Sequence, residues 1–396
     1  MHCNVYIGTW QIGSDIMDIC VLNPFFYPYM GGTEKVLLEV YSRLARRHNV
    51  CVISAALESG KKAGTDYVGD IKVVRLRTRY INLPGLPMPF LAMAGVKAAI
   101  AKESADIYHI NNRYQYFFDS ISAIKKAGGR LAMTIHNSLP SGIGPFTDAG
   151  GMLYDIAQGR RTMHAADLIT GVSKDTIDTT VPKADRWKSH VVYNGIDYRR
   201  FRPRRQTDRR IRTIQSMFNG LPIVLGNGRL TPQKGQAYLI DAVSRMKEKV
   251  GLALIGTGPL ETALRKRALA ARMAGRFSIL NGIPENGLPF YYNAAALFAM
   301  PSLYEPAGLA LLEALASGTP SIASHIGGIP EMMGGCGLYT KPKDIKSIRE
   351  RLEFALSHRP SMQRLAARGR ARMIKLHDWN NIARQYERLF EETIKR

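Results

Sequence analysis

The sequence predicts an α/β protein made of two doubly wound halves that face each other across a cleft. Met17–Asn23 is a short apolar run typical of a buried strand, and a loop ending in Gly31-Gly32 separates it from a helical pattern. The same order of strand, glycine-rich loop and helix begins again at Ile223–Leu225. A chain of 396 residues is too long for one ordinary core. Because ligands bind open α/β sheets at the carboxyl ends of the strands, we expect a binding cleft between the halves.

The first half alternates strands and helices. Apolar residues recur on one face from Thr33 to Leu44, which predicts a helix, and the apolar run Val50–Ser54 predicts the second strand. Further strands are expected at 71–75, 107–110, 131–135, 168–172 and 190–193. This succession is the doubly wound pattern, in which helices cover both faces of a parallel sheet.

The second half repeats the pattern beyond an arginine-rich segment. We expect strands at 223–225, 252–255, 277–280, 297–300 and 321–323, with helices at 237–246 and 260–273. Another helix is expected to begin near 306–308, since a proline suits the first turn of a helix.

Two carboxylates, Glu305 and Glu313, flank the start of that last helix. Eight residues of helix rise about 12 Å, which is close to the span from the sugar to the ribose of a nucleotide-sugar. The backbone N–H groups at the helix start would face an anion held between the two carboxylates. Taken alone, this segment fits equally an Ala/Leu core helix that carries two incidental glutamates.

Composition limits the class of protein. A formal net charge of +23 favours anionic partners, namely nucleic acid, anionic lipid or phosphorylated substrates, unless the charges are simply solvated. The four cysteines are scattered, which favours a reducing compartment and suggests neither a disulfide framework nor a zinc site. We find no transmembrane pattern, and we expect a cytoplasmic protein, with a peripheral position at the inner face of the membrane as a further hypothesis.

Three groups of residues lie where strand-end loops should line the cleft. Gly31-Gly32 would let backbone approach a ligand, and the cations Arg229 and Lys234 would suit a diphosphate. His136 follows the strand at 131–135 and should also reach the cleft. Each group has an ordinary alternative: a tight turn, solvated surface charges, or a packed histidine.

These pieces occur together and in order, and the sequence resembles the retaining glycosyltransferases of the GT-B fold, the large group called glycosyltransferase family four. The resemblance covers roughly residues 17–392 and is most specific in the second half. The motifs that carry it are Tyr27–Glu34, Val172-Ser173, Val192–Asp197, Gly228–Gly235, Ile255–Pro259, Glu305–Pro320 and Gly327–Glu331.

The resemblance implies a role for each candidate residue. Arg229 and Lys234 would neutralise the leaving diphosphate, Glu313 would accept hydrogen bonds from the ribose, and Glu305 would hold hydroxyls of the donor sugar. His136 would contact that sugar near its anomeric carbon. The remaining donor contacts are assigned to the backbone of Gly31, Gly32, Ile283, Gly308 and Leu309.

The resemblance also implies how the chain is organised and what it binds. It divides the chain into an N-terminal extension (1–16), an acceptor-side domain (17–200), an Arg-rich linker (201–212), a nucleotide-sugar-binding domain (213–376) and a C-terminal helix that packs back on the first domain (377–396). The expected donor is a UDP- or GDP-sugar. The residues themselves suggest the acceptor: the apolar stretch Tyr80–Val96, broken by prolines and close to Arg75, Arg77 and Arg79, suits an anionic bilayer, so we expect a glycan or a lipid-linked hydroxyl near such a surface, with an ordinary acceptor-pocket loop and helix as the alternative. No cofactor, metal or nucleic acid is expected, and the sequence has no Asp-x-Asp pair.

Two other function classes remain open at this point. The +23 charge suits a basic nucleic-acid- or membrane-binding protein on a non-catalytic scaffold of the same fold, although no aromatic-interleaved basic strand or recognition helix is evident. A nucleotide-sugar epimerase would share the fold and the donor but transfer nothing to an acceptor. Same-face attack and a covalent intermediate on Glu305 are both compatible with the residues.

Overall fold

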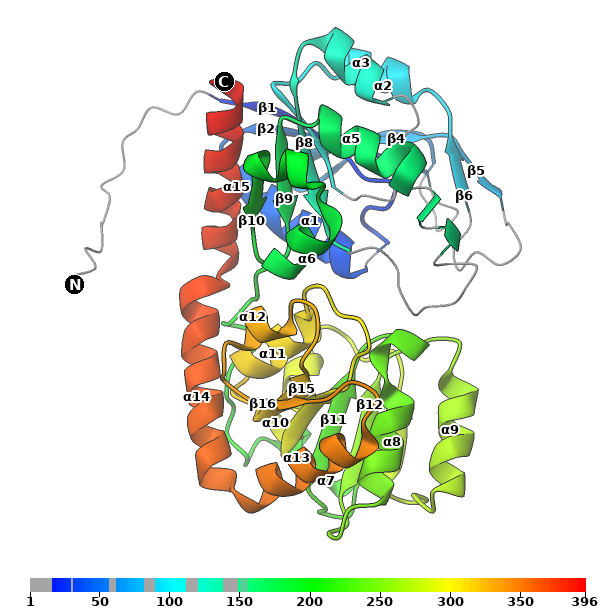
Figure 1. Ribbon diagram of the computed structural model, residues 1–396, viewed down its shortest axis with the longest axis vertical. Helices are drawn as coiled ribbons and strands as arrows, with labels where there is room; N and C mark the ends of the chain where they lie inside the picture. Colours follow the sequence, from blue (N-terminus) through cyan, green and yellow to red (C-terminus); the bar gives the residue numbers. More distant parts are fainter. Residues whose placement is uncertain are drawn as a thin grey trace, which may run out of the picture.

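The protein forms two lobes, each built on its own sheet, as seen in the computed structural model (Figure 1). The structure describes residues 16–29, 31–56, 62–81, 90–111, 120–137, 149–150, 152–153 and 155–396. The expected N-terminal extension therefore lies outside the described residues, apart from the exposed Ile16. The two α/β lobes and the long C-terminal helices agree with the predicted fold class.

The first lobe contains an eight-stranded sheet in the order β10-β9-β8-β7-β1-β2-β4-β3 among the described residues. Every neighbouring pair is parallel except β3 with β4. The strands are β1 (Asp18–Leu22), β2 (Asn49–Ala55), β3 (Gly64–Val68), β4 (Ile71–Leu76), β7 (Ile107–Ile110), β8 (Arg130–Ile135), β9 (Leu168–Gly171) and β10 (Ser189–Val191). Strands β5 (Thr78–Ile81) and β6 (Phe90–Met93) form a separate antiparallel pair.

The second lobe contains a six-stranded sheet in the order β13-β12-β11-β14-β15-β16, and every neighbouring pair in it is parallel. The strands are β11 (Ile223–Asn227), β12 (Gly251–Ile255), β13 (Phe277–Leu280), β14 (Leu297–Met300), β15 (Ser321–Ser324) and β16 (Leu338–Thr340). They are apolar and buried almost throughout, because helices cover both faces of a parallel sheet.

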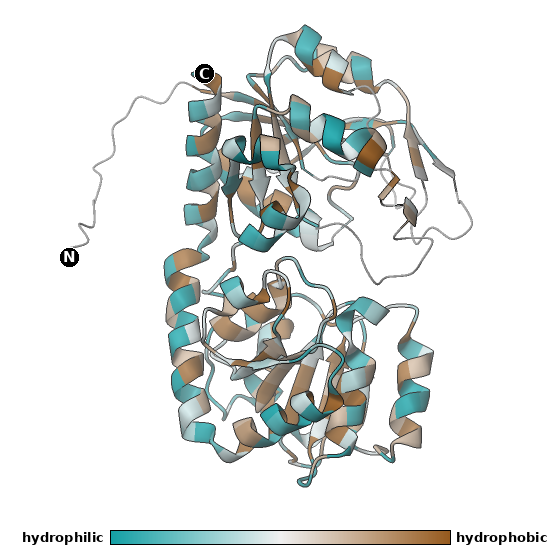
Figure 2. Cartoon of the chain, viewed as in Figure 1, coloured by the Kyte–Doolittle hydropathy of each residue, from teal (hydrophilic) through white to brown (hydrophobic). Residues whose placement is uncertain are grey.

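Helices fill the connections between the strands. In the first lobe they are α1 (Gly32–Leu44), α2 (Val96–Lys102), α3 (Ser120–Ala127), the π-helical turn η1 (Asp155–Gly159), α5 (Arg160–Ala165), α6 (Lys174–Thr180) and the 3₁₀ segment η2 (Lys183–Lys188). In the second lobe they are α7 (Arg209–Ser216), η3 (Pro232–Lys234), α8 (Gln236–Ser244), α9 (Glu261–Ala270), α10 (Leu288–Ala294), α11 (Leu309–Ala316), α12 (Ile329–Met333) and α13 (Ile345–Ser357). Figure 2 shows the resulting pattern, with hydrophobic strands inside and largely hydrophilic outer helix faces.

The chain ends in two long helices that run along one side of both lobes (Figure 1). Helix α14 (Arg359–Leu376) packs on α11 of the second lobe, and α15 (Trp379–Ile394) packs on α1 of the first. The turn between them is buried: the backbone N–H of Ile196 donates to the carbonyl of His377, and Asp378 caps α15. The C-terminal helix thus crosses back to the first lobe, as predicted.

The structure differs from the sequence-based expectation at several elements. Strands β3, β5, β6 and β16 were not predicted. Strands β3, β5 and β16 are short and lack a clear apolar pattern, whereas the apolar β6 directly follows the prolines at 84, 87 and 89, which disfavour a strand. Helix α11 begins at Leu309, so the prediction of a start near 306–308 with Pro306 in the first turn is wrong. Part of the expected linker at 201–212 is helical, since α7 begins at Arg209 and packs on α10. Residues 82–89, the proline-containing part of the apolar stretch Tyr80–Val96, lie outside the described residues.

Candidate active site

Glu305 and Lys234 form an ion pair at the carboxyl edge of the second sheet. Lys234 ends the short η3 segment after β11, and Glu305 lies in the loop after β14, so neighbouring strands bring them together. Lys234 Nζ lies 2.5 Å from Glu305 Oε2, and the Glu305 side chain is only 8% exposed. A buried carboxylate needs such a partner, because its charge would otherwise be desolvated without compensation.

The second oxygen of Glu305 shapes the start of α11. Gly308 adopts φ +58°, a left-handed conformation that favours glycine, and its backbone N–H donates to Glu305 Oε1 over 3.1 Å. Glu305 therefore lies outside the helix and folds back onto its first N–H group. This turn explains why Pro306 is not a helical residue.

Glu313 lies on α11 and is held by three side chains. Tyr292 Oη donates to Glu313 Oε2 over 2.8 Å, and Asn227 Nδ2 lies 3.4 Å from the same oxygen. Lys35 of α1 lies 3.3 Å from Glu313 Oε1, so a cation of the first lobe reaches this carboxylate. Burial and the Glu313 charge raise the pKa of Tyr292 well above its usual value, which keeps its hydroxyl a donor.

Arg229 is exposed in the loop after β11 and faces the first lobe. Its charge acts on Tyr29 and on Glu34, which lies in the first turn of α1. Burial raises the pKa of Glu34, while backbone N–H groups of Glu34 and Gly31, Asn23 and the Arg229 charge act in the opposite direction. Arg229 thus stands between the two lobes.

Gly31 and Gly32 bring the first lobe close to the same edge. A methyl group on Gly31 would lie 2.5 Å from Glu34 Oε2, and one on Gly32 would lie 3.4 Å from Leu309 Cδ1 at the start of α11. Gly32 therefore lets the start of α1 lie directly against the start of α11, while Gly31 makes room for the Glu34 carboxylate of its own lobe. The predicted motif residues of both lobes meet here.

His136 lies at the carboxyl edge of the first sheet, immediately after β8. It is buried, and its Nε2 lies 3.2 Å from Asn111 Oδ1, which follows the neighbouring strand β7. Burial lowers the pKa of His136 to about 4, so the ring is neutral near pH 7. The adjacent His109 is buried too, and burial together with His136 lowers its pKa to about 3.

Ile283 lies in the loop after β13, half-buried against the core of the second lobe. Two residues later, Glu285 contacts Lys35 over 3.4 Å and Arg200 over 2.9 Å. Burial raises the pKa of Glu285, but the Lys35 and Arg200 charges outweigh burial and hold the pKa below its usual value. Lys35 therefore connects the loop of Ile283 with Glu313.

The segment Gly327–Glu331 packs against the backbone of Glu305 and Pro306 and also contacts the first lobe. Methyl groups on Gly327 and Gly328 would lie 2.4 Å from the carbonyl oxygen of Glu305 and 2.1 Å from that of Pro306. Glu331 accepts hydrogen bonds from the backbone N–H groups of Lys174 (2.8 Å) and Asp175 (3.0 Å). A carboxylate of the second lobe thus caps α6 of the first.

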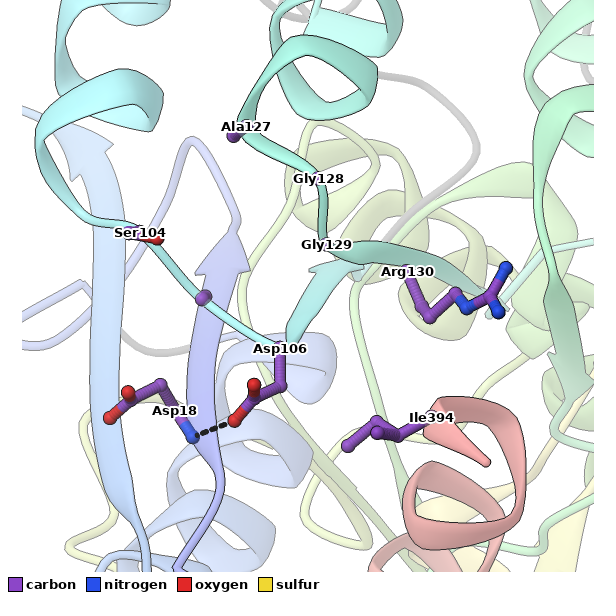
Figure 3. A pocket seen from close by; sticks show the side chains of 9 residues that line it. Asp18, Ser104, Asp106, Ala127, Gly128, Gly129, Arg130 and Ile394 are labelled. Atoms are coloured by element: carbon purple, nitrogen blue, oxygen red, sulfur yellow. Dashed lines mark hydrogen bonds between the residues drawn. The ribbon is translucent and has the colours of Figure 1, made fainter. Parts of the chain in front are cut away.

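A separate pocket lies at the opposite edge of the first sheet. It encloses about 580 Å³ at the amino ends of β1, β7 and β8, beside Ile394 of α15 (Figure 3). Asp106 Oδ2 accepts a hydrogen bond from the backbone N–H of Asp18 there. The motif residues all lie on loops at the other ends of the strands, so this pocket is not part of the site.

Two further findings concern the described residues alone. Within them no group of three or more His, Cys, Asp or Glu side chains is arranged to hold a metal ion. No helix in the described ranges combines the length and the apolar character needed to cross a bilayer.

The sequence indicated the charged residues of the second lobe but not their partners. Lys35, Asn227 and Tyr292 were missed, and Glu34 was quoted only as part of a motif, with no role assigned to it. Each follows or precedes a motif residue by a few positions, or lies on α10, and none forms a distinctive pattern. A lysine in the first turn of a helix looks like an ordinary surface charge until the second lobe is placed against it.

Comparison with protein families gives two matches that together span most of the chain. The family described as "Glycosyl transferases group 1" matches residues 208–372, and "Glycosyltransferase Family 4" matches residues 30–200.

Individual relatives agree with these matches. The chain is 30% identical over 327 residues to alpha-maltose-1-phosphate synthase of Mycolicibacterium smegmatis, covering 75% of this chain and 84% of that protein. It is 27% identical to the GDP-mannose-dependent alpha-(1-6)-phosphatidylinositol monomannoside mannosyltransferase of the same organism, covering 82% of this chain and 85% of that one.

Solved structures share the fold. Anabaena HepE in complex with UDP and glucose superposes with a TM-score of 0.75 at 20% identity, covering 95% of this chain and 100% of that chain. Sucrose-phosphate synthase of Thermosynechococcus elongatus gives a TM-score of 0.72 at 20% identity, with 94% and 98% covered. Both have the two-lobed architecture described above.

Proposed function

The chain belongs to the group 1 glycosyltransferases, in the family four group of the GT-B fold, and we propose that it moves a sugar from a UDP- or GDP-sugar to a hydroxyl acceptor with retention of configuration. The observation that carries the proposal is the Lys234–Glu305 ion pair beside Glu313, on one edge of one sheet. This arrangement places a cation next to carboxylates that can accept hydrogen bonds from hydroxyl groups. A nucleotide-sugar needs both kinds of group, because it has an anionic diphosphate and sugar hydroxyls.

The charges of the second lobe would bind the donor. Arg229 and Lys234 would hold the diphosphate and stabilise the negative charge that develops as it leaves. Glu313 would accept hydrogen bonds from the ribose, and Glu305 would accept them from the sugar. The HepE structure in complex with UDP and glucose supports a donor of this chemical class.

Backbone groups and the first lobe would complete the donor site. The N–H groups of Gly308 and Leu309 would bind near the sugar and the phosphates, and Ile283 would contact the base through its main chain. Gly31 and Gly32 would close over the phosphates. His136, neutral near pH 7, would hydrogen-bond the sugar without adding charge beside the anomeric carbon.

The reaction would proceed through an oxocarbenium-like state. As the bond between the anomeric carbon and the diphosphate oxygen breaks, Arg229 and Lys234 supply the neutralising charge that a metal ion supplies in other transferases. The acceptor hydroxyl would then attack from the face that the diphosphate leaves. Proton NMR of the glycosylated acceptor tests retention, because the anomeric centre of a glycoside does not mutarotate: an anomeric configuration opposite to that of the donor would contradict it.

We propose a glycan or lipid-linked hydroxyl as the acceptor, presented at an anionic membrane surface. The name of the phosphatidylinositol monomannoside mannosyltransferase among the relatives supports a lipid-linked acceptor. On the first lobe, Met152, Leu153 and Ile156 are exposed beside the exposed Arg160 and Arg161, and the net charge is +23. Apolar and basic side chains together favour an anionic bilayer surface. Co-sedimentation with anionic liposomes at low salt is expected, and its absence would contradict the membrane part of the proposal.

Thermal shift provides the first test of the donor. Addition of UDP, GDP or ADP is expected to raise the melting temperature, because a ligand that binds only the folded state stabilises it. Glu313→Ala should abolish the shift, whereas Glu350→Ala, an exposed carboxylate on α13, should leave it intact. No stabilisation by any of the three nucleotides would contradict the proposal.

Product analysis then distinguishes transfer from epimerisation. A screen of nucleotide-sugars for hydrolysis, followed by a screen of acceptors, is expected to show release of the nucleoside diphosphate together with a glycosylated acceptor. Conversion of one nucleotide-sugar into another without release of the nucleotide would instead identify an epimerase.

A further inference from the structure

Lys35 is a cation of the first lobe whose side chain reaches into the second. It lies in the first turn of α1, three residues after Gly32. Its Nζ lies 3.3 Å from Glu313 Oε1 and 3.4 Å from Glu285 Oε1, and its side chain is only 16% exposed. A lysine held between two carboxylates of another lobe is more than a solvated surface charge.

The position of Lys35 follows from how α1 is anchored. Its neighbours Val36 and Leu37 are buried in the core of the first lobe, and the backbone N–H of Lys35 donates to the carbonyl of Gly31. Gly32 in turn lies against Leu309, the first residue of α11. The first turn of α1 is therefore fixed against the helix that carries Glu313, and only a long side chain is needed to reach it.

The two oxygens of Glu313 have different surroundings. Oε2 faces the donors Tyr292 and Asn227, both from the second lobe, over 2.8 and 3.4 Å. Oε1 faces Lys35. The second lobe thus orients one oxygen, and the first lobe supplies the charge beside the other.

We propose that Lys35 is a positioning residue of the donor site, which holds Glu313 oriented for the ribose hydroxyls. The inference rests on the proposed function, because it assigns the ribose to Glu313. It adds that the ribose end of the site is assembled from both lobes. Glu285, two residues after Ile283, shares the same ammonium group and connects it to the loop assigned to the base.

Binding of a nucleotide and of its analogue without ribose hydroxyls tests this role. The probes are whichever of UDP, GDP and ADP binds most tightly and its 2′,3′-dideoxy counterpart, titrated calorimetrically into the full chain. Lys35→Met should weaken the ribonucleotide about tenfold, as expected for loss of a group that supports charge-assisted hydrogen bonds. The affinity of the same variant for the dideoxynucleotide, which lacks the hydroxyls that Glu313 would bind, should fall by less than about twofold.

Two variants serve as controls. Lys35→Arg keeps the charge and should restore most of the ribonucleotide affinity, with the longer side chain tolerated between two carboxylates. Lys125→Met makes the same substitution at an exposed site on α3 and should change neither affinity. Circular dichroism and a melting curve show whether Lys35→Met is folded.

The outcomes separate this inference from the proposed function. Suppose that the wild-type protein binds the ribonucleotide, but Lys35→Met lowers the affinities for both nucleotides equally or leaves both unchanged. Lys35 is then only a structural contact between the lobes and the inference is wrong, while the proposed function stands. If wild type binds no nucleoside diphosphate, both are wrong. If Lys35→Met is unfolded, the Lys35→Arg variant decides: full loss of selectivity for the ribonucleotide would contradict a role based on charge.

Discussion

The carboxyl edges of the two sheets are built alike but carry opposite chemistry. Among the described residues, the part of the first sheet's edge around His136 is neutral: His136 has a pKa of about 4, and its partner Asn111 is uncharged. The edge of the second sheet carries the Lys234–Glu305 pair, Glu313 and Arg229. One fold, repeated in one chain, thus provides a charged wall around Glu305 and Glu313 and a neutral wall around His136.

This contrast arises from the loops after the strands, since the central strands of both sheets, such as β1 and β8 in the first and β12 and β14 in the second, are largely apolar and buried. The first lobe also reaches across with Lys35, which pairs with Glu313 and Glu285. The charged wall is therefore not the property of one lobe alone. Changes that remove its charges should lower donor binding or turnover, and changes around His136 should in addition alter the stability of the protein in acid.

Removal of Lys234, the half-buried cation paired with Glu305, should give the largest effect. Lys234→Met deletes a charge assigned to the diphosphate and leaves Glu305 buried without its partner, so turnover should fall by at least about 100-fold. Steady-state kinetics measures the change, with Lys249→Met, the same substitution at an exposed site before β12, as the control. Activity of Lys234→Met within about threefold of wild type would contradict the claim that the charges at the second sheet's edge serve the reaction.

Removal of the exposed cation should have a smaller effect. Arg229→Gln is expected to lower kcat/KM about 10- to 200-fold, since one charge-assisted hydrogen bond is worth about 1.5–3 kcal/mol. Arg229 is exposed, so the melting temperature should barely change. A large loss of stability with unchanged kinetics would instead make Arg229 a structural residue between the lobes.

A fall in pH should lower the stability of the protein mainly through the buried histidines His136 and His109. Burial keeps His136 and His109 neutral, with pKa values of about 4 and 3, whereas an unfolded chain binds a proton on each ring below about pH 6.5. The contribution of these neutral rings to the free energy of unfolding is fully present above pH 6.5 and is lost as the pH falls toward 4. At pH 5 the free energy of unfolding should be lower by about 2 kcal/mol for each ring.

Urea unfolding at pH 7 and pH 5 measures this loss. Replacement of the ring by an uncharged amide in His136→Gln should reduce the difference between the two pH values by about 2 kcal/mol. An unchanged difference would mean that the His136 ring takes up its proton in the folded protein as readily as in the unfolded chain.

The contact between the lobes should have the smallest effect. Glu331→Gln keeps the shape of the group that caps α6 but removes its charge, which should cost about 1 kcal/mol of stability. Differential scanning calorimetry detects the loss, and Glu350→Gln on the exposed face of α13 is the control. An equal melting temperature for both variants would show that the cap contributes nothing.

The sequence predicted the fold class and the charged residues because both depend on local patterns. Alternating apolar runs and glycine-rich loops identify most strands of both sheets, and Glu305, Glu313, Arg229 and Lys234 stand in ordered motifs. Short strands such as β3 and β16 escaped, since few of their residues alternate or form a buried run.

The contacts that complete the site could not be predicted, because they depend on how the lobes meet. Lys35 and Glu313 are far apart in the sequence, and Asn227 and Tyr292 reach Glu313 from different elements. Pro306 shows a local failure. A proline near a helix start normally predicts that it lies in the first turn. Here Glu305 accepts the hydrogen bond from the Gly308 N–H, and the helix begins at Leu309, three residues after Pro306.

The structure of the protein with a bound nucleoside diphosphate tests the central claim most directly. The account predicts that the diphosphate contacts Arg229 and Lys234 at hydrogen-bonding distance, with the ribose on Glu313 and no charged group of the first sheet's edge against the phosphates. A nucleotide bound instead at the neutral edge around His136 and Asn111, or in the pocket beside Asp106 and Arg130, would contradict it.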